Sequence, residues 1–245
     1  MKVKWRKLIR AIKGTAPIIF ILITSVPFAE ARILFFGRKE TQVEKDLRSK
    51  KPDVKIKAIK KAGEIKAKEA VDELIDIVKK DSSIPARQDA CEALGKLGDN
   101  SAVSVLVSVL TSDERNEVKI GAISALYEIG SEEAIAGLRS TLNDNNKDVK
   151  ITIIKFLAEL KDKESLDNFR KLAEDNDTDI RATAVYALGK LGDKKSVIKA
   201  LEDKDEKVKE KAVDALGRMG ETEELEKIKD KNLKKRAEIF LKRKK

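Results

Sequence analysis

The apolar residues of this chain recur with the period of a helix, and the pattern as a whole recurs along the sequence. The letters ALGKLGD stand at 93–99 and again at 187–193, and the related ALGRMGE stands at 215–221. A fixed period of this length is typical of stacked structural repeats. The leucine of the phrase is separated by 32, 31, 31 and 28 residues in its successive copies, Leu94, Leu126, Leu157, Leu188 and Leu216.

Each repeat is predicted to contain two helices joined by a tight corner. In the fifth repeat, Gly192 stands where a first helix would end in the left-handed conformation, and Asp193 can cap the second helix. Gly189 is expected to let a neighbouring helix come close. The fourth repeat has neither glycine in FLAELK at 156–161, so its corner is expected to be looser or capped differently.

The joints between repeats are rich in Asp, Asn and Ser, which favour turns. The run DNDTD at 175–179 resembles a calcium loop, but Ile180 and Tyr186 stand where that loop needs glycine and glutamate. We interpret it as an inter-repeat turn.

We therefore expect an all-α fold, a solenoid of about six two-helix repeats with a capping helix at each end. A single helix pair cannot bury both of its sides, so the pairs must stack. The repeats are predicted to occupy 52–232, after a linker and N-terminal capping helix at 32–51 and before a basic C-terminal capping helix at 233–245.

The pattern D-x-x-V-[RK]-x-x-A-x-x-A-L-G-x-[LI]-G, followed by a second helix, resembles the short bacterial HEAT-like repeats also found in phycobilin lyase subunits. The resemblance covers about 180 of the 245 residues. It implies that the first helices line the convex side and the second helices the concave side. Because the motif consists of packing residues, it specifies a fold and says little about function.

Residues 1–31 form a separate segment with the order of a secretory signal. Six basic residues precede the uncharged APIIFILITSVPF at 16–28, and Ala29 and Ala31 fit the small-x-small cleavage rule. The alternative is a retained inner-membrane anchor. Thirteen residues in a helix span about 20 Å, short of a hydrocarbon core of roughly 30 Å, which favours cleavage and export to the periplasm or cell envelope.

Composition argues against catalysis. The chain has no histidine, which removes the commonest general base and metal ligand, and it has a single cysteine, Cys91, whose neighbours are apolar or small. We expect a buried structural cysteine, no catalytic residues, no metal and no cofactor. The chain is expected not to be an enzyme, and no small-molecule substrate is evident.

Charge divides the chain into basic ends and an acidic body. Residues 38–68 carry net +7, residues 227–245 net +8, and residues 69–226 net −11. In one interpretation, the charges only keep the exposed outer faces of the terminal repeats solvated. In another, the basic ends bind an anionic envelope surface, with salt-sensitive association to anionic vesicles. Export and the lack of a basic surface interleaved with aromatics argue against nucleic acid.

The stretch NSAVSVLVSVLTS at 100–112 has no charge in a chain that is 39% charged. Its apolar residues form one helix face, and the hydroxyl residues form the other. Either this is an unusually buried central helix or the hydroxyl face is a contact surface that another backbone can approach. The candidate partner-binding residues are Ser101, Ser104, Ser108 and Thr111.

The leading functional hypothesis is an exported, non-catalytic scaffold that binds another protein through the concave face. The alternatives are an envelope surface binder that uses its basic ends and a lyase or chaperone subunit of the HEAT-like type. A lyase subunit is expected to reside in the cytosol beside a pigment, which the N-terminal signal argues against.

If the leader is cleaved, the exported protein begins at Arg32. N-terminal sequencing of protein from the envelope fraction checks this, and a chain that still begins at residue 1 in the membrane fraction indicates the retained anchor instead.

Overall fold

The computed structural model describes residues 40–113 and 115–242, so the N-terminal leader lies outside the described residues. The chain divides after Gln42, and the second unit, Val43–Lys245, contains the repeats. Within the described residues all regular elements are helices. Each repeat begins with a long helix, and these first helices are α5 (Pro52–Glu64), α7 (Ile84–Leu97), α9 (Asn116–Ile129), α11 (Lys147–Glu159), α13 (Thr178–Lys190) and α15 (Glu206–Met219).

The second helix of each repeat is shorter, and short 3-10 turns begin or end several of them. These second helices are α6 (Val71–Lys80), α8 (Val103–Ser112), α10 (Glu132–Ser140), α12 (Leu166–Leu172), α14 (Lys194–Lys199) and α16 (Thr222–Glu226). The helix α4 (Gln42–Leu47) precedes the repeats and α17 (Lys231–Leu241) follows them. The predicted all-α solenoid of six helix pairs with a capping helix at each end is therefore confirmed.

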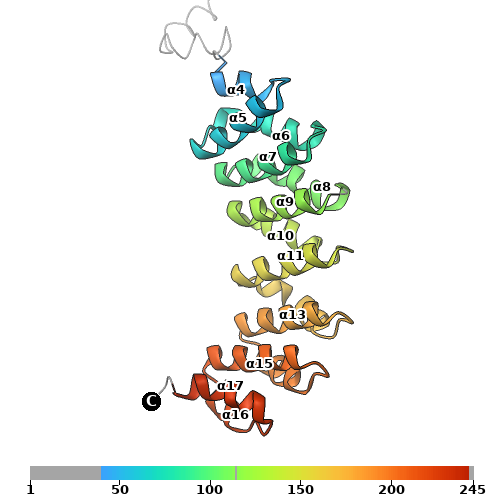
Figure 1. Ribbon diagram of the computed structural model, residues 1–245, viewed down its shortest axis with the longest axis vertical. Helices are drawn as coiled ribbons and strands as arrows, with labels where there is room; N and C mark the ends of the chain where they lie inside the picture. Colours follow the sequence, from blue (N-terminus) through green and yellow to red (C-terminus); the bar gives the residue numbers. More distant parts are fainter. Residues whose placement is uncertain (1–39, 114, 243–245) are drawn as a thin grey trace, which may run out of the picture. The chain divides into compact units, whose positions relative to one another are not determined.

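The first helices stack on one another in chain order, and each second helix packs against the first helices beside it (Figure 1). The repeated leucine lies at the centre of this packing. Its side chain is 0% exposed in all five copies, and so is Ala62, which takes its place in the first repeat. The core thus continues from one repeat to the next, because the apolar side of each pair is covered by its neighbours.

Small residues let the first helices come close together. A Cβ added to Gly189 would lie 2.6 Å from the Cβ of Ala215 on α15, and one added to Gly95 would lie 2.7 Å from the Cα of Ala125 on α9. Real side chains do not approach so closely, so the expected role of Gly189 in close packing is confirmed.

The junction between α9 and α11 is packed differently. Tyr127 stands where α7 and α13 have these glycines, and Phe156 stands opposite, where the neighbouring helices have alanine. The two rings stack with centroids 4.4 Å apart and an angle of 14° between their planes. The α9 and α11 backbones come close together over a shorter stretch than those of α7 and α9. Here a pair of aromatic rings replaces the contact between small residues.

The corners close as the sequence predicts, with one exception. Gly192 takes the left-handed conformation with φ of 79°, and the Asp193 side chain accepts a hydrogen bond from the Ser196 N–H. The corner of the fourth repeat was expected to be looser or capped differently. It is not looser, because Lys161 has φ of 54°, its N–H donates to the Ala158 carbonyl, and the Asp162 N–H donates to that of Leu157, as at the Gly192 corner. It is capped differently, because the Asp162 side chain makes no capping hydrogen bond to a backbone N–H of the second helix.

A basic residue near the start of most first helices joins two consecutive joints. Arg181, 3% exposed, donates to both carboxylate oxygens of Asp203 at 2.9 and 3.0 Å and to the Asp175 and Asn176 carbonyls at 3.0 Å. Removing one partner from a buried pair of this kind costs about 3–5 kcal/mol. The equivalent pairs in the described chain are Lys55–Asp81, Arg87–Asp113, Lys119–Asp144 and Lys150–Asp175.

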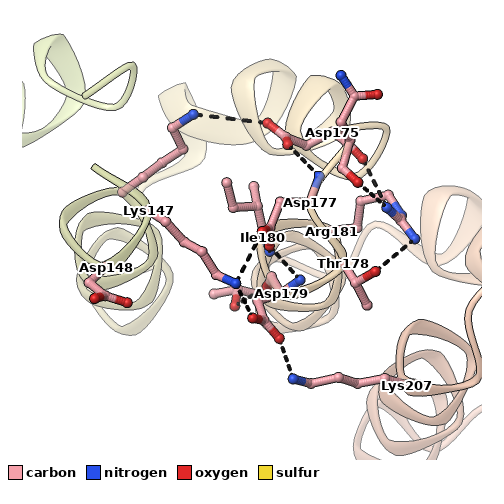
Figure 2. A network of polar contacts seen from close by, with 12 residues as sticks. Lys147, Asp148, Asp175, Asp177, Thr178, Asp179, Ile180, Arg181 and Lys207 are labelled. Carbon is pink, nitrogen blue, oxygen red and sulfur yellow. Dashed lines mark hydrogen bonds and ion pairs between the residues drawn. The ribbon is translucent and has the colours of Figure 1, made fainter. Parts of the chain in front are cut away.

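The DNDTD run forms the turn into α13, as we interpreted it (Figure 2). The Asp175 carboxylate accepts from the Asp177 N–H at 2.9 Å, and the Asp177 carboxylate caps α13 by accepting from the N–H groups of Asp179 and Ile180. The Asp179 carboxylate binds Lys147 of α11 and Lys207 of α15. The three aspartates thus hold helix starts together, and Asp179 links three consecutive first helices.

Exchanging the two kinds of corner residue tests the strain at Lys161. A left-handed residue with a side chain costs about 1 kcal/mol relative to glycine. We expect Lys161→Gly to raise the free energy of unfolding by about 1 kcal/mol, measured by denaturant titration. The matched reverse change, Gly192→Lys, should lower the free energy of unfolding by a similar amount. A Cβ added to Gly192 would contact no other atom within 4 Å, so only the backbone φ of 79° disfavours the substitution. An unchanged stability in both variants contradicts this account.

The Asp179 link should depend on pH. Hydrogen bonds from Lys147 and then Lys207 lower the pKa of Asp179 from 3.8 to about 2. Because the folded chain holds the carboxylate ionised, this stabilisation is complete above the unfolded pKa near 4 and is lost as the pH falls through 2.

We therefore expect Asp179→Asn to destabilise the protein at pH 5 and the difference from wild type to narrow towards pH 2, in thermal unfolding at low salt. Asp148→Asn is the matched control, since Asp148 holds the corresponding position of α11 and forms no ion pair with another described side chain. A constant difference across this pH range contradicts the link.

Candidate functional site

The hydroxyl residues predicted to bind a partner lie together on the exposed side of one second helix. Ser101 lies in the 3-10 turn Asn100–Ala102, and Ser104, Ser108 and Thr111 follow on α8. All four are exposed. On the opposite side of α8, Leu106 is 0% and Leu110 1% exposed. The apolar side of the uncharged stretch is therefore core and its hydroxyl side is exposed, and the role of that side as a contact surface stays a prediction.

The exposed hydroxyls mostly donate to their own helix. Ser108 Oγ donates to the Val105 carbonyl at 2.7 Å, and Thr111 Oγ1 donates to the Ser108 carbonyl at 3.0 Å. Their oxygens retain acceptor capacity towards solvent. A partner can cover such a surface without removing a charge from water, which is the expensive part of burying polar groups.

The uncharged surface continues onto α10, which the sequence reasoning missed. A Cβ added to Gly137 would lie 2.3 Å from Cγ2 of Val107, so α8 and α10 touch. Ala136 and Ser140 occupy on α10 the positions of Ser104 and Ser108 and are exposed. Aligning the repeats would have found them, but Glu132, Glu133 and Arg139 hide them in the sequence. We call the following residues the uncharged patch: Ser101, Ser104, Ser108, Thr111, Ala136 and Ser140.

Charged residues border the uncharged patch on both sides. The positions of Ser104 and Ser108 are taken by Asp72 and Asp76 on α6, and by Asp167 and Lys171 on α12, and all four are exposed. Asp76 pairs with Lys80 at 2.8 Å, and Asp167 pairs with Arg170 at 2.9 Å. At these two positions, α8 and α10 are thus uncharged and the second helices on either side of them are charged.

The two tyrosines lie on first helices, away from this patch. Tyr127 packs on Phe156 within the α9–α11 junction. Tyr186 on α13 is half-buried and donates its hydroxyl to Glu159. Neither adds to the surface formed by the second helices.

Cys91 is a structural residue. It is 0% exposed on α7, and burial raises the pKa of its thiol from 9.0 to about 12. The thiolate is the reactive form of cysteine, so at neutral pH this side chain is inert and acts as a small apolar residue. The expected buried cysteine is confirmed.

Among residues 40–113 and 115–242, no group of three or more His, Cys, Asp or Glu side chains is arranged to hold a metal ion. Over the same residues, no helix is both long and apolar enough to cross a bilayer.

Comparison with known proteins agrees with this architecture. The family model described as HEAT repeats matches residues 43–127, 71–146 and 135–199, together more than half of the chain. No curated protein matches the sequence. Many solved structures share the fold, among them the following two, which have low sequence identity to this chain.

The first is the complex of CpcE and CpcF of phycocyanin lyase from Nostoc sp. PCC7120, with 20% identity, a TM-score of 0.51, and coverage of 84% of this chain and 90% of that one. The second is the Escherichia coli protein YibA, with 16% identity, a TM-score of 0.53, and coverage of 73% and 71%. At these identities the likeness concerns the fold alone. With its stacked two-helix repeats and the family match over most of them, the chain belongs to the HEAT-repeat family.

Proposed function

We propose that this protein is an exported, non-catalytic scaffold that binds another protein through the face formed by its second helices. The observation that carries the proposal is the uncharged patch on α8 and α10, exposed in a chain in which 39% of the residues are charged. Helix formation does not require serine at these positions, because lysine and glutamate are better helix formers and fill the exposed positions of most other helices.

The chemistry of the patch suits contact with a polypeptide. Its side chains are small, so another backbone can come close, and its hydroxyl oxygens can accept hydrogen bonds from backbone N–H groups. The charged borders on α6 and α12 add polar contacts at the rim, the usual composition of a protein interface. Repeat proteins commonly bind over several adjacent repeats, which agrees with a patch that spans two.

Export is the second part of the proposal and rests on residues 1–31. A periplasmic or envelope location agrees with the single, buried cysteine, because no second thiol of the chain could pair with it in an oxidising compartment. An uncleaved N-terminus that anchors the protein in the inner membrane is the alternative.

A second candidate is binding to an anionic envelope surface through the basic ends. It is favoured by α17, where Lys231, Lys234 and Lys235 are exposed beside Ile239, which is 53% exposed. Basic residues beside an exposed apolar side chain suit the boundary of an anionic membrane. A role as a lyase or chaperone subunit has less support, since the likeness to the lyase complex extends only to the fold.

Charge placed on the patch should abolish binding to the partner. In Ser104→Glu/Ser108→Glu, two carboxylates replace hydroxyls on the exposed side of α8, so the interface would have to bury them. The partner is the protein that the wild type retains from an envelope extract, identified by mass spectrometry. We expect the amount of this partner retained by the variant to fall about tenfold or more.

The control is Ser82→Glu/Asn145→Glu, which adds the same charge at two exposed joint positions. It should retain as much of the same partner per mole of bait as the wild type does. Circular dichroism should show equal helix content in all three proteins. Equal retention by the patch variant and wild type contradicts the proposal.

A further inference from the structure

A groove lies between the first helices α13 and α15. These two helices follow α8 and α10, which carry the uncharged patch, along the stack (Figure 1). The volume of the groove is about 410 Å³. Gly189 and Ala215 form the part of its floor where the two helices are closest, and the half-buried Leu191 and Met219 add apolar surface at the corner end.

Four cations surround this floor, and we call this feature the basic groove. Lys190 stands on the α13 wall, Lys211 and Arg218 stand on the α15 wall, and Lys161 closes the end from the preceding corner. All four are exposed. The Tyr186 ring lies between the walls, with Lys190 Nζ 5.9 Å and Arg218 Cζ 6.0 Å from its centroid.

The carboxylates near the groove are already engaged. Asp214 accepts two hydrogen bonds from Arg236, both at 2.7 Å. Glu159 pairs with Lys190 at 2.8 Å and accepts the Tyr186 hydroxyl. Within the described chain, Lys161, Lys211 and Arg218 form no ion pair. Three of the four groove cations therefore have no ion-pair partner among the described residues, and the groove carries an excess of positive charge.

The corresponding groove at the corner ends of α5, α7 and α9 shows that this charge is not required by the fold. That groove has a volume of about 460 Å³ and is lined by Gly63 and Gly95, with Lys66 and Lys96 beside Glu64 and Glu128. Its two lysines are balanced by two glutamates. A hydrogen bond to Glu92 raises the pKa of the Lys96 amine, and Glu128 and Glu64 add to this increase. The same corner geometry thus occurs once with balanced charge and once with an excess of cations.

We propose that the basic groove binds an acidic segment of a partner polypeptide, in which carboxylates alternate with apolar side chains. The carboxylates pair with the cations on the two walls, and an apolar side chain covers Leu191 and Met219. A free phosphate would leave the apolar floor uncovered, and a flat membrane surface does not enter a recess between two helices. Charge complementarity and the mixed lining of the groove therefore both favour a peptide.

The probe is a fluorescently labelled peptide in which glutamates alternate with leucines, with a glutamine version as its neutral counterpart. Anisotropy titrations use the full chain at low and high salt. We expect the glutamate peptide to bind, the glutamine peptide not to bind, and binding to weaken with salt. Lys211→Glu/Arg218→Glu should raise the Kd by about tenfold or more, since each reversal replaces an attraction by a repulsion.

The control is Lys195→Glu/Lys234→Glu, the same charge change at two exposed lysines outside the groove, which should retain binding. If circular dichroism shows that the charge reversals disturb folding, Lys211→Gln/Arg218→Gln takes their place. This variant should give a milder loss of peptide binding. Equal binding of both peptides, or wild-type affinity in both groove variants, overturns the proposal. The proposal is also overturned if inorganic phosphate displaces the glutamate peptide. It is likewise overturned if the peptide does not bind and phosphatidylglycerol vesicles associate with the protein in a way that depends on the groove cations.

The basic groove and the uncharged patch can be tested separately. Ser104→Glu/Ser108→Glu should bind the glutamate peptide with the wild-type Kd. Failure of the peptide to bind overturns the groove alone and leaves partner capture through α8 unaffected.

Discussion

Each helix pair has apolar side chains on two sides, and only the pairs before and after it can remove both from water. The repeated leucine is 0% exposed in every copy because the neighbouring repeats cover it. Stability is therefore shared along the stack, and the two end repeats need α4 and α17, since each would otherwise leave one apolar side in solvent. Every other feature of the fold serves this stacking.

The distance between neighbouring first helices is set by the residues at their contact. At Gly189 and Ala215 no side chain separates the backbones, whereas at the α9–α11 junction the rings of Tyr127 and Phe156 lie between them. Between the joints, cations such as Arg181 satisfy carbonyl and carboxylate oxygens that would otherwise be buried without partners. Small residues, aromatic rings and buried ion pairs are thus three solutions to the same problem of joining one repeat to the next.

Once the core positions are occupied, the exposed positions are free to differ from one repeat to the next. At the positions of Ser104 and Ser108, the second helices α6 and α12 carry charged residues, whereas α8 and α10 carry small uncharged ones. The corner groove formed by α5, α7 and α9 is charge-balanced, whereas the groove between α13 and α15 is basic. The side chains of the uncharged patch and the four cations of the basic groove are exposed and lie outside the core, so they can serve binding without cost to the stack. A fold built from one repeated unit acquires distinct surfaces in this way.

The sequence alone determined the number of repeats, the two helices in each, the left-handed corner at Gly192 and the cap at Asp193, because these depend on hydrogen bonds and side-chain spacing within a short window. It also identified the hydroxyl face of α8, whose residues share one helix. Only the tertiary structure decided that Lys161 closes the fourth corner as glycine does, because stacking on both sides holds that corner in place. The tertiary structure also revealed three further features. The patch extends onto α10, Asp179 links three helices, and Lys161, Lys190 and Arg218 meet in one groove. These residues lie far apart along the chain and come together through the packing of whole helices, which no local pattern encodes.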